Sequence, residues 1–121
     1  MELQRLDARL TVCKPADLRD VRLDGELFFL GRTDEELSLV CRTEDNPART
    51  TAREDGWRGF RIRGVLDFSL VGVLARLSGI LAAQGISLFA VSTWNTDYVL
   101  VREEQFDRAL AALAAEGYDI V

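Results

Sequence analysis

The sequence predicts a mixed α+β fold in which two helices cover one face of an antiparallel sheet. Residues 70–84 and 103–116 carry apolar side chains at the three- and four-residue spacing of amphipathic helices. The glycines that follow, Gly85 and Gly117, can end these helices in a left-handed conformation. Apolar runs typical of strands stand before, between and after the helices. The resulting order, β-α-β-β-α-β over residues 57–121, is that of the ferredoxin-like fold.

The strands of this second half are short and rich in apolar residues. They are expected at residues 57–65, 86–93, 98–101 and 118–121. The run 86–93 is apolar on both faces, whereas a strand in a sheet covered on one side alternates apolar and polar residues. The second face of this sheet is therefore expected to be covered by the first half of the chain or by another subunit.

The first half of the chain is rich in predicted strands and poor in helix. Strands are expected at residues 8–13, 27–30 and 37–42, and the polar stretch 43–56, with Pro47 and Gly56, is expected to be a linker or long loop. Residues 1–56 are thus predicted to form a strand-rich unit and residues 57–121 a second unit. The first unit is interpreted as a degenerate, helix-poor copy of the second.

Composition limits the function classes. The chain has 121 residues, 48% of them hydrophobic, which suits one compact domain or two very small units that share a core. Its net charge of −5 argues against non-specific nucleic-acid binding. It has no histidine, and Cys13 and Cys41 are isolated, so we expect no metal site and no cofactor. Buried thiols are expected for both cysteines, with a disulfide as the alternative.

The N-terminus lacks the apolar core of a signal peptide, and no apolar run reaches membrane-spanning length. We therefore expect a cytoplasmic protein with no membrane partner.

Two stretches of the sequence resemble a known family. The stretch from residue 67 to residue 101 reads DFSLVGVLARLSGILAAQGISLFAVSTWNTDYVLV, and an upstream stretch, residues 28–41, reads FFLGRTDEELSLVC. Together with WRGFRIRG at residues 57–64, they resemble ACT domains of the subgroup found in small bacterial tandem-ACT proteins. This subgroup is related to the regulatory domains of aspartate kinases and to CASTOR-type arginine sensors. The resemblance implies paired ACT units that bind an amino acid allosterically, typically at an interface between units.

The turn before the first helix is the first candidate binding segment. The helix start presents backbone N–H groups without intrahelical partners, which favour a ligand carboxylate. Asp67 could hold the ligand ammonium, and Gly72 would let the ligand approach the backbone. The alternative is plain helix capping by Ser69 or Asp67, with Gly72 needed for packing on the sheet. The candidate residues of this turn are Asp67, Phe68, Ser69, Leu70, Val71 and Gly72.

The turn at residues 92–97 is the second candidate binding segment. Its polar side chains could complete the pocket, although the same residues are ordinary turn formers. The candidates are Thr93, Asn95, Thr96 and Asp97, with Trp94 as a lid or an interface anchor. Thr33 and Asp34 form the equivalent feature of the first half, for which a solvated turn is the alternative.

We therefore expect a non-catalytic regulatory module that binds a small molecule, most simply an amino acid. Possible protein partners are a second copy of the chain or a regulated enzyme. The alternative is an assembly module whose pocket binds nothing. Catalysis is disfavoured because the chain has no histidine and no paired nucleophile and base. Acylphosphatase activity is disfavoured because the loop at residues 67–71 has no arginine to hold phosphate, and RNA recognition because there is no basic face or aromatic sheet motif.

Overall fold

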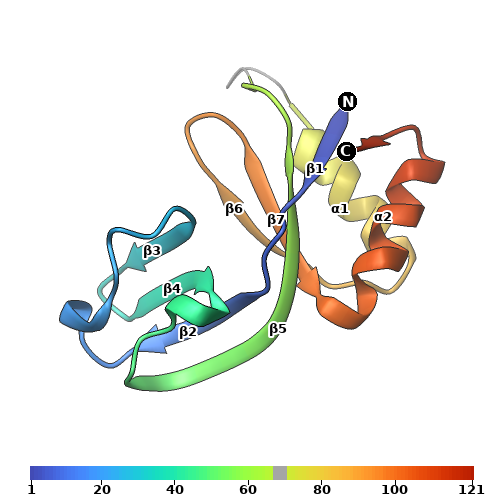
Figure 1. The fold of residues 1–121 in the computed structure, drawn as a ribbon. Coiled ribbons are helices and arrows are strands. Elements are labelled where there is room, and N and C mark those ends of the chain that lie inside the picture. Colours follow the sequence, from blue (N-terminus) through green and yellow to red (C-terminus); the bar gives the residue numbers. More distant parts are fainter. Residues whose placement is uncertain (67–70) are drawn as a thin grey trace. The chain divides into compact units, whose positions relative to one another are not determined.

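The computed structural model describes residues 1–66 and 71–121, which form two compact units (Figure 1). One unit combines Met1–Asp7 with Arg58–Val121 and holds both α-helices, and we call it the helical unit. The other, Ala8–Trp57, is the strand unit. The long strand β5 (Thr50–Ile62) begins in the strand unit and ends in the helical unit.

Residues 1–7 lie in a different unit from the one that the sequence predicts. The prediction assigns them to the first unit, but β1 (Glu2–Arg5) pairs antiparallel with β5 and parallel with β8 (Asp119–Ile120). The cause is Leu3, which has no exposed surface and belongs to the core of the helical unit. The ends of the chain therefore complete the same sheet.

The sheet of the helical unit has the order β6-β7-β5-β1-β8. Strands β6 (Phe89–Ser92) and β7 (Asp97–Arg102) form an antiparallel hairpin, and β7 also pairs with β5. The strands β5, β6, β7 and β8 supply the four strands of the predicted β-α-β-β-α-β order. The N-terminal strand β1 lies between the first and the last of them.

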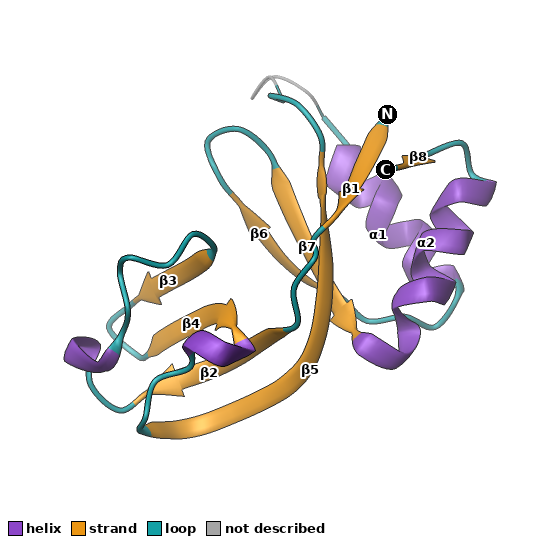
Figure 2. Ribbon diagram, viewed as in Figure 1, coloured by secondary structure: helices purple, strands orange, loops and turns teal. Residues whose placement is uncertain are grey.

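Both α-helices cover one face of this sheet (Figure 2). Helix α1 spans Val73–Ala83, and α2 spans Phe106–Ala115 after a 3-10 turn at Glu103–Gln105. Gly85 and Gly117 end the helices with φ of +71° and +98°, which confirms the predicted stops. The largest fully buried side chains of this core are Leu3, Phe60, Ile62, Leu77, Leu81, Val99, Val101 and Leu113. Among the described residues, no helix is long and apolar enough to cross a membrane.

The strand unit has the same strand order without α-helices. Strands β2 (Leu10–Pro15), β3 (Phe28–Arg32), β4 (Leu37–Arg42) and β5 form an antiparallel sheet in the order β3-β4-β2-β5. Only two 3-10 turns, Leu18–Asp20 and Thr43–Asp45, interrupt the strands of residues 8–57. In both units the four strands that follow one another after β1 thus lie in the order second, third, first, fourth, and in the helical unit β1 is inserted between the last two. The strand unit lacks α-helices, as predicted.

The core of the strand unit is small and contains both cysteines. Cys13 and Cys41 are free and buried beside Val21 and Leu39. Burial raises the pKa of both thiols, that of Cys41 to about 12. Two buried thiols are thus found where the sequence predicts them.

The loop predicted at residues 43–56 is wrong in its second part, because β5 begins at Thr50. The strand is hard to recognise because its residues 51–55 are all exposed, so the apolar alternation of a half-buried strand is missing. Pairing with β2, in which Cys13 faces Arg53 and Val12 faces Glu54, holds it in the sheet. Gly56, with φ of +83°, lies where the register of this pairing shifts, as in a β-bulge.

Candidate ligand-binding site

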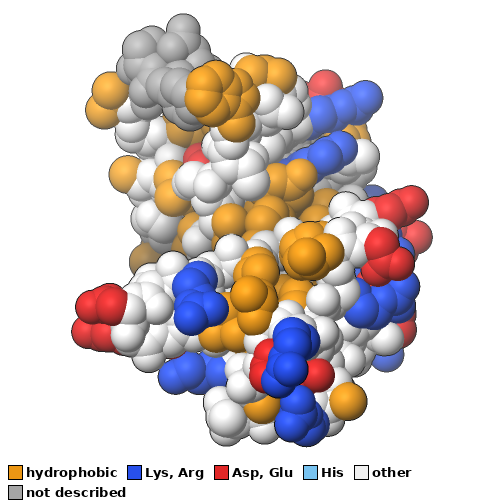
Figure 3. Space-filling model, turned by 90° about the vertical axis from the view of Figure 1, so that its left-hand side faces the viewer, with side chains coloured by type: hydrophobic (Ala, Val, Ile, Leu, Met, Phe, Trp, Pro, Cys, Tyr) orange, Lys and Arg blue, Asp and Glu red, His pale blue; other side chains and the backbone are white. Residues whose placement is uncertain are grey.

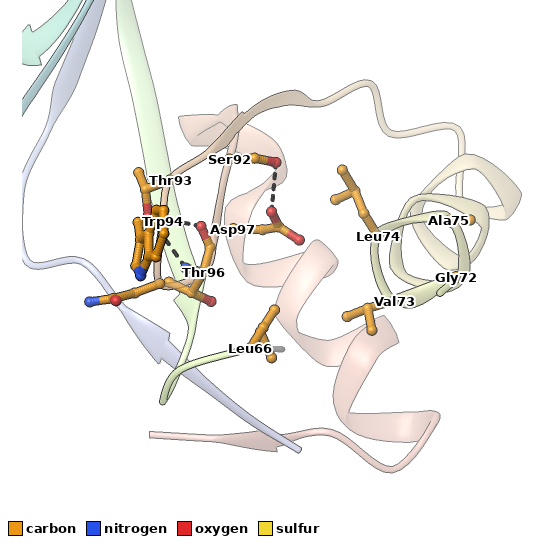
Figure 4. A pocket seen from close by; sticks show the side chains of 11 residues that line it. Leu66, Gly72, Val73, Leu74, Ala75, Ser92, Thr93, Trp94, Thr96 and Asp97 are labelled. Atoms are coloured by element: carbon orange, nitrogen blue, oxygen red, sulfur yellow. Dashed lines mark hydrogen bonds between the residues drawn. The ribbon is translucent and has the colours of Figure 1, made fainter. Parts of the chain in front are cut away.

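A pocket of about 320 Å³ lies in the helical unit between the start of α1 and the turn that joins β6 to β7 (Figure 4). Its lining residues are Leu66, Gly72, Val73, Leu74, Ala75, Ser92, Thr93, Trp94, Asn95, Thr96 and Asp97. The pocket thus joins Gly72, the last residue of the first predicted segment, to the turn of the second predicted segment. A volume of this size is at the lower end of the range for small-molecule sites.

The helix wall of the pocket begins at Gly72. This residue has φ of +82°, and its carbonyl accepts the first helical hydrogen bond from the Arg76 N–H at 2.9 Å. A left-handed residue cannot lie inside an α-helix, so α1 begins at Val73 and not at residue 70 as predicted. The N–H groups of Val73, Leu74 and Ala75 precede the first intrahelical bond and carry the partial positive charge of the helix start.

The reason for a glycine at position 72 is its backbone conformation. A Cβ atom built on Gly72 would meet no atom of residues 1–66 or 71–121 within 4 Å. Packing of Gly72 against the sheet, the alternative considered above, therefore does not account for this glycine. A side chain here would be strained because φ lies in the left-handed region.

The turn wall is fixed by hydrogen bonds to the end of β5 and the segment that follows it. The Thr96 hydroxyl donates to the Ile62 carbonyl at 2.7 Å, and the Leu66 N–H donates to the Asn95 carbonyl at 2.7 Å. Within the turn, the Thr93 hydroxyl donates to the Thr96 carbonyl at 3.0 Å. The hydroxyls of Thr93 and Thr96 thus hold the turn in shape, which is the role that ordinary turn chemistry assigns to them.

Asp97 is the one charged side chain among the described residues that line the pocket. It is partly buried, and the Ser92 hydroxyl donates to its Oδ1 at 2.6 Å (Figure 4). This bond fixes one carboxylate oxygen and leaves the second oxygen with its acceptor capacity. The pocket therefore combines a carboxylate on the turn wall, N–H groups at the helix start, and apolar surface from Leu66, Val73 and Leu74.

The other predicted residues fall outside this pocket or outside the described residues. Asp67, Phe68, Ser69 and Leu70 lie outside the described residues. Val71 is 94% exposed and does not line the pocket.

Thr33 and Asp34 lie in the β3–β4 turn of the strand unit. There the Thr33 hydroxyl accepts hydrogen bonds from the N–H groups of Glu35 and Glu36, both at 3.1 Å. The structure thus brings together Gly72, Thr93, Asn95, Thr96 and Asp97, and it does not add Thr33 or Asp34 to their pocket.

Several lining residues are not among the predicted ones. Val73 and Leu74 contribute to the apolar stripe of the helix, and that stripe assigns them to the core, although both lie in the first turn of α1. Ser92 belongs to the predicted segment 92–97 but not to its named candidates, and it faces Asp97 across the four residues of the turn. Nothing in the sequence around Leu66 signals that it lines a pocket.

Residues 52–115 match the ACT domain family. The human protein "Cytosolic arginine sensor for mTORC1 subunit 1" is 37% identical over 65 residues, which cover 53% of this chain and 20% of that protein. The bovine protein of the same name matches equally. The chain therefore spans about a fifth of the length of these curated relatives.

Two solved structures have similar folds. A crystal structure of an Agobacterium tumefaciens protein superposes with a TM-score of 0.86 at 27% identity and covers 99% of this chain and 91% of that one. The regulatory subunit of aspartate kinase from Thermus thermophilus, in its ligand-free form, superposes with a TM-score of 0.62 at 12% identity over 95% and 96% of the two chains. The second likeness shows the fold alone.

The family match covers more than half of the chain and includes the described pocket. Residues 52–115 contain most of β5, both walls of the pocket and all of α2. With the strand order and the two helices, this match identifies the chain as a member of the ACT domain family.

Proposed function

We propose that this chain is a non-catalytic regulatory module that binds an amino acid in the pocket of the helical unit. The observation that carries the proposal is the position of Asp97 across the pocket from the start of α1 (Figure 4). A free amino acid has an ammonium and a carboxylate on one carbon. The ammonium would donate to Asp97, and the carboxylate would accept from the N–H groups at the helix start.

The name of the human relative supports this ligand class, because it describes a sensor of arginine, which is an amino acid. The same name describes a cytosolic protein, which supports a cytoplasmic location for this chain. We retain Asp67 as a second contact for the ammonium. Regulation of an enzyme or association with a second copy would then transmit the binding event.

The proposal is tested by titration calorimetry of the whole chain with each of the twenty amino acids. A selective ligand should also raise the melting temperature, because a ligand present at about 100 times its dissociation constant adds about 2.7 kcal/mol to the free energy of unfolding. Arginine is the first ligand to test, in view of the relatives' name.

Asp97→Asn is the matched variant for this titration. The amide keeps an oxygen for the Ser92 hydroxyl but removes the negative charge, so we expect ligand affinity to fall by about tenfold or more. Asp119→Asn, on the exposed end of β8, is the control and should bind as the wild type does. Equal affinity of the Asp97 variant and the wild type would refute the role of Asp97. Failure of the wild type to bind any amino acid would instead favour an assembly module.

A further inference from the structure

We propose that the pocket selects an amino acid with an aliphatic side chain, such as leucine, over one with a polar or charged side chain. This inference rests on the proposed function, because it takes the ligand to be an amino acid and concerns which kind is bound. The described walls offer polar groups to the ammonium and the carboxylate, which every amino acid has. They offer apolar surface to the side chain, which distinguishes one amino acid from another.

The hydroxyl groups of the turn wall already donate within the chain. The Ser92 hydroxyl donates to Asp97 at 2.6 Å, and the Thr93 hydroxyl donates to the Thr96 carbonyl at 3.0 Å. The Thr96 hydroxyl donates to the Ile62 carbonyl at 2.7 Å. Because each hydroxyl has a single O–H to donate, a polar ligand side chain gains a hydroxyl donor on this wall only by breaking one of these bonds.

The other polar groups of the described walls suit the ammonium and the carboxylate of the ligand. They are the second oxygen of Asp97 and the N–H groups at the start of α1. The side chains of Asn95 and Trp94 are exposed, so water already solvates their polar atoms and a ligand gains little by replacing it. With Asp97 bound to the ammonium, no second carboxylate is left among the described lining residues for a basic side chain. A guanidinium would then lose water without an ionic partner, which is costly.

An apolar surface lines the rest of the pocket. Leu66, Val73 and Leu74 pack against the core of the helical unit, and each also lines the pocket. Figure 4 shows these three side chains around the space that the carboxylate of Asp97 faces. Packing against the core holds this surface in place before a ligand arrives. Each methylene of an aliphatic side chain that is buried against it should tighten binding by roughly fourfold.

Charged side chains are scarce at this pocket compared with the whole chain. Asp97 is the one charged residue among the 11 described lining residues, whereas 29% of the chain is charged. Figure 3 shows that charged side chains gather in clusters with hydrophobic and other uncharged surface between them, and the lining of the pocket is of the second kind. A single carboxylate matches the single ammonium of an amino acid whose side chain carries no charge.

The test compares leucine with asparagine by titration calorimetry of the full chain. The side chains of these two amino acids have the same branched shape and differ in polarity, so the comparison separates polarity from fit. We expect leucine to bind at least about tenfold more tightly, because the asparagine amide would lose water against the apolar surface without gaining a partner. Arginine and lysine should also bind at least about tenfold more weakly than leucine. Affinity should rise from alanine to valine to leucine.

Leu66→Asn is the variant that tests the apolar surface. It changes polarity at nearly constant shape and leaves the backbone bond from residue 66 to the Asn95 carbonyl in place. We expect the preference for leucine over asparagine to fall by about tenfold. Val73→Thr makes the same kind of change on α1, and it serves as a second variant if Leu66→Asn lowers the melting temperature. Val65→Asn, at an exposed position outside the lining, is the control and should keep the preference of the wild type.

The outcomes separate this inference from the proposed function. Binding of asparagine or arginine as tightly as leucine would overturn the inference and leave the amino-acid function in place. An unchanged preference in both Leu66→Asn and Val73→Thr would also overturn it, because the apolar surface would then not select the ligand. If no amino acid binds to the wild type, the proposed function fails and the inference fails with it.

Discussion

The hairpins β3–β4 and β6–β7 have the same local structure in two different settings. The Thr33 N–H donates to the Glu36 carbonyl at 3.0 Å, and the Thr93 N–H donates to the Thr96 carbonyl at 2.9 Å. The strands β4 and β7 then lead into 3-10 turns through Arg42 and Arg102, both with φ of −61° and ψ of 142°. Each feature of the second hairpin lies sixty positions after its counterpart in the first.

The two units diverge directly after these 3-10 turns. Asn46 is extended, with ψ of 139°, because a residue before proline is disfavoured in the helical region and Pro47 follows it. The counterpart, Phe106, has ψ of −50° and begins α2. The pocket is built from a hairpin turn and a helix start, and the strand unit has no α-helix to supply the second. The described pocket therefore depends on the start of α1 as well as on a turn whose hydrogen bonding both units share.

The largest expected effect is the loss of stability when the apolar core between the helices and the sheet of the helical unit is disrupted. Phe60 has no exposed surface and lies in the core of the helical unit. We expect Phe60→Ala to lower the free energy of unfolding by about 3–5 kcal/mol, because a large cavity forms between sheet and helices. Urea denaturation followed by circular dichroism measures it.

Leu39→Ala is the matched change in the strand unit, where partly buried Phe28 and Leu30 can move to fill part of the space. Its cost should lie near the lower end of the usual range, about 2 kcal/mol. A larger loss for Leu39→Ala than for Phe60→Ala would show that the strand unit, without helices, has the more rigid core.

The next prediction concerns the proline that follows the 3-10 turn of the strand unit and has no counterpart in the helical unit. Asp107 is the counterpart of Pro47, and Asp107→Pro would put proline directly after Phe106. Because Phe106 must stay helical, we expect a loss of about 1–3 kcal/mol of stability and some loss of helical signal. Asp107→Ala is the control, with an expected effect within about 0.5 kcal/mol for an exposed position. If Asp107→Pro is as stable as Asp107→Ala, proline alone does not explain the missing helix of the strand unit.

The sequence predicts the regular parts of this fold well and the irregular parts poorly. The bounds of β4 agree with the predicted 37–42, and the glycine stops of both helices are where the pattern places them. Each of these segments packs one face against an apolar core, so its apolar side chains recur at a regular spacing that can be recognised in the sequence. The first half of β5 has no such pattern, because its side chains are exposed and only backbone pairing with β2 defines it.

The candidate site was predictable as two segments but not as a set of residues. Helix starts and polar turns have local signatures, and these predict Gly72 and the turn that contains Asp97. Leu66 and the first-turn residues Val73 and Leu74 line the pocket through tertiary packing, which leaves no local signature. The same holds for β1, whose position beside β5 depends on the burial of Leu3.

A third prediction concerns the polar contacts of the strand unit. The Thr11 hydroxyl is fully buried, donates to Asp55 Oδ1 at 2.7 Å and lies 2.9 Å from the Thr43 hydroxyl. Thr11→Val should cost about 1–3 kcal/mol of unfolding free energy, because Thr43 and Asp55 lose a buried partner. Thr51→Val, an exposed change on β5, is the control. Equal stabilities of the two variants would mean that water replaces the Thr11 hydroxyl at no cost.

The smallest expected effect is the dependence of stability on pH through Asp55. Hydrogen bonds from the Arg53 guanidinium and then from Thr11 hold the pKa of Asp55 below its usual value. The stabilisation is therefore present above the unfolded pKa, about 3.9, and is lost as the pH falls through the lower pKa of the folded state. Since the carboxylate is 49% exposed, we expect at most about 1 kcal/mol.

Asp55→Asn should thus be less stable than the wild type at neutral pH, and this difference should shrink in acid. Glu44→Gln changes another exposed carboxylate of the strand unit and controls for net charge. Urea midpoints at neutral and acid pH measure the difference. A stability difference that stays constant in acid would show that Asp55 acts through the shape of its hydrogen bonds and not through its charge. The polar contacts of the strand unit would then stabilise the protein independently of pH, as the apolar core of the helical unit does.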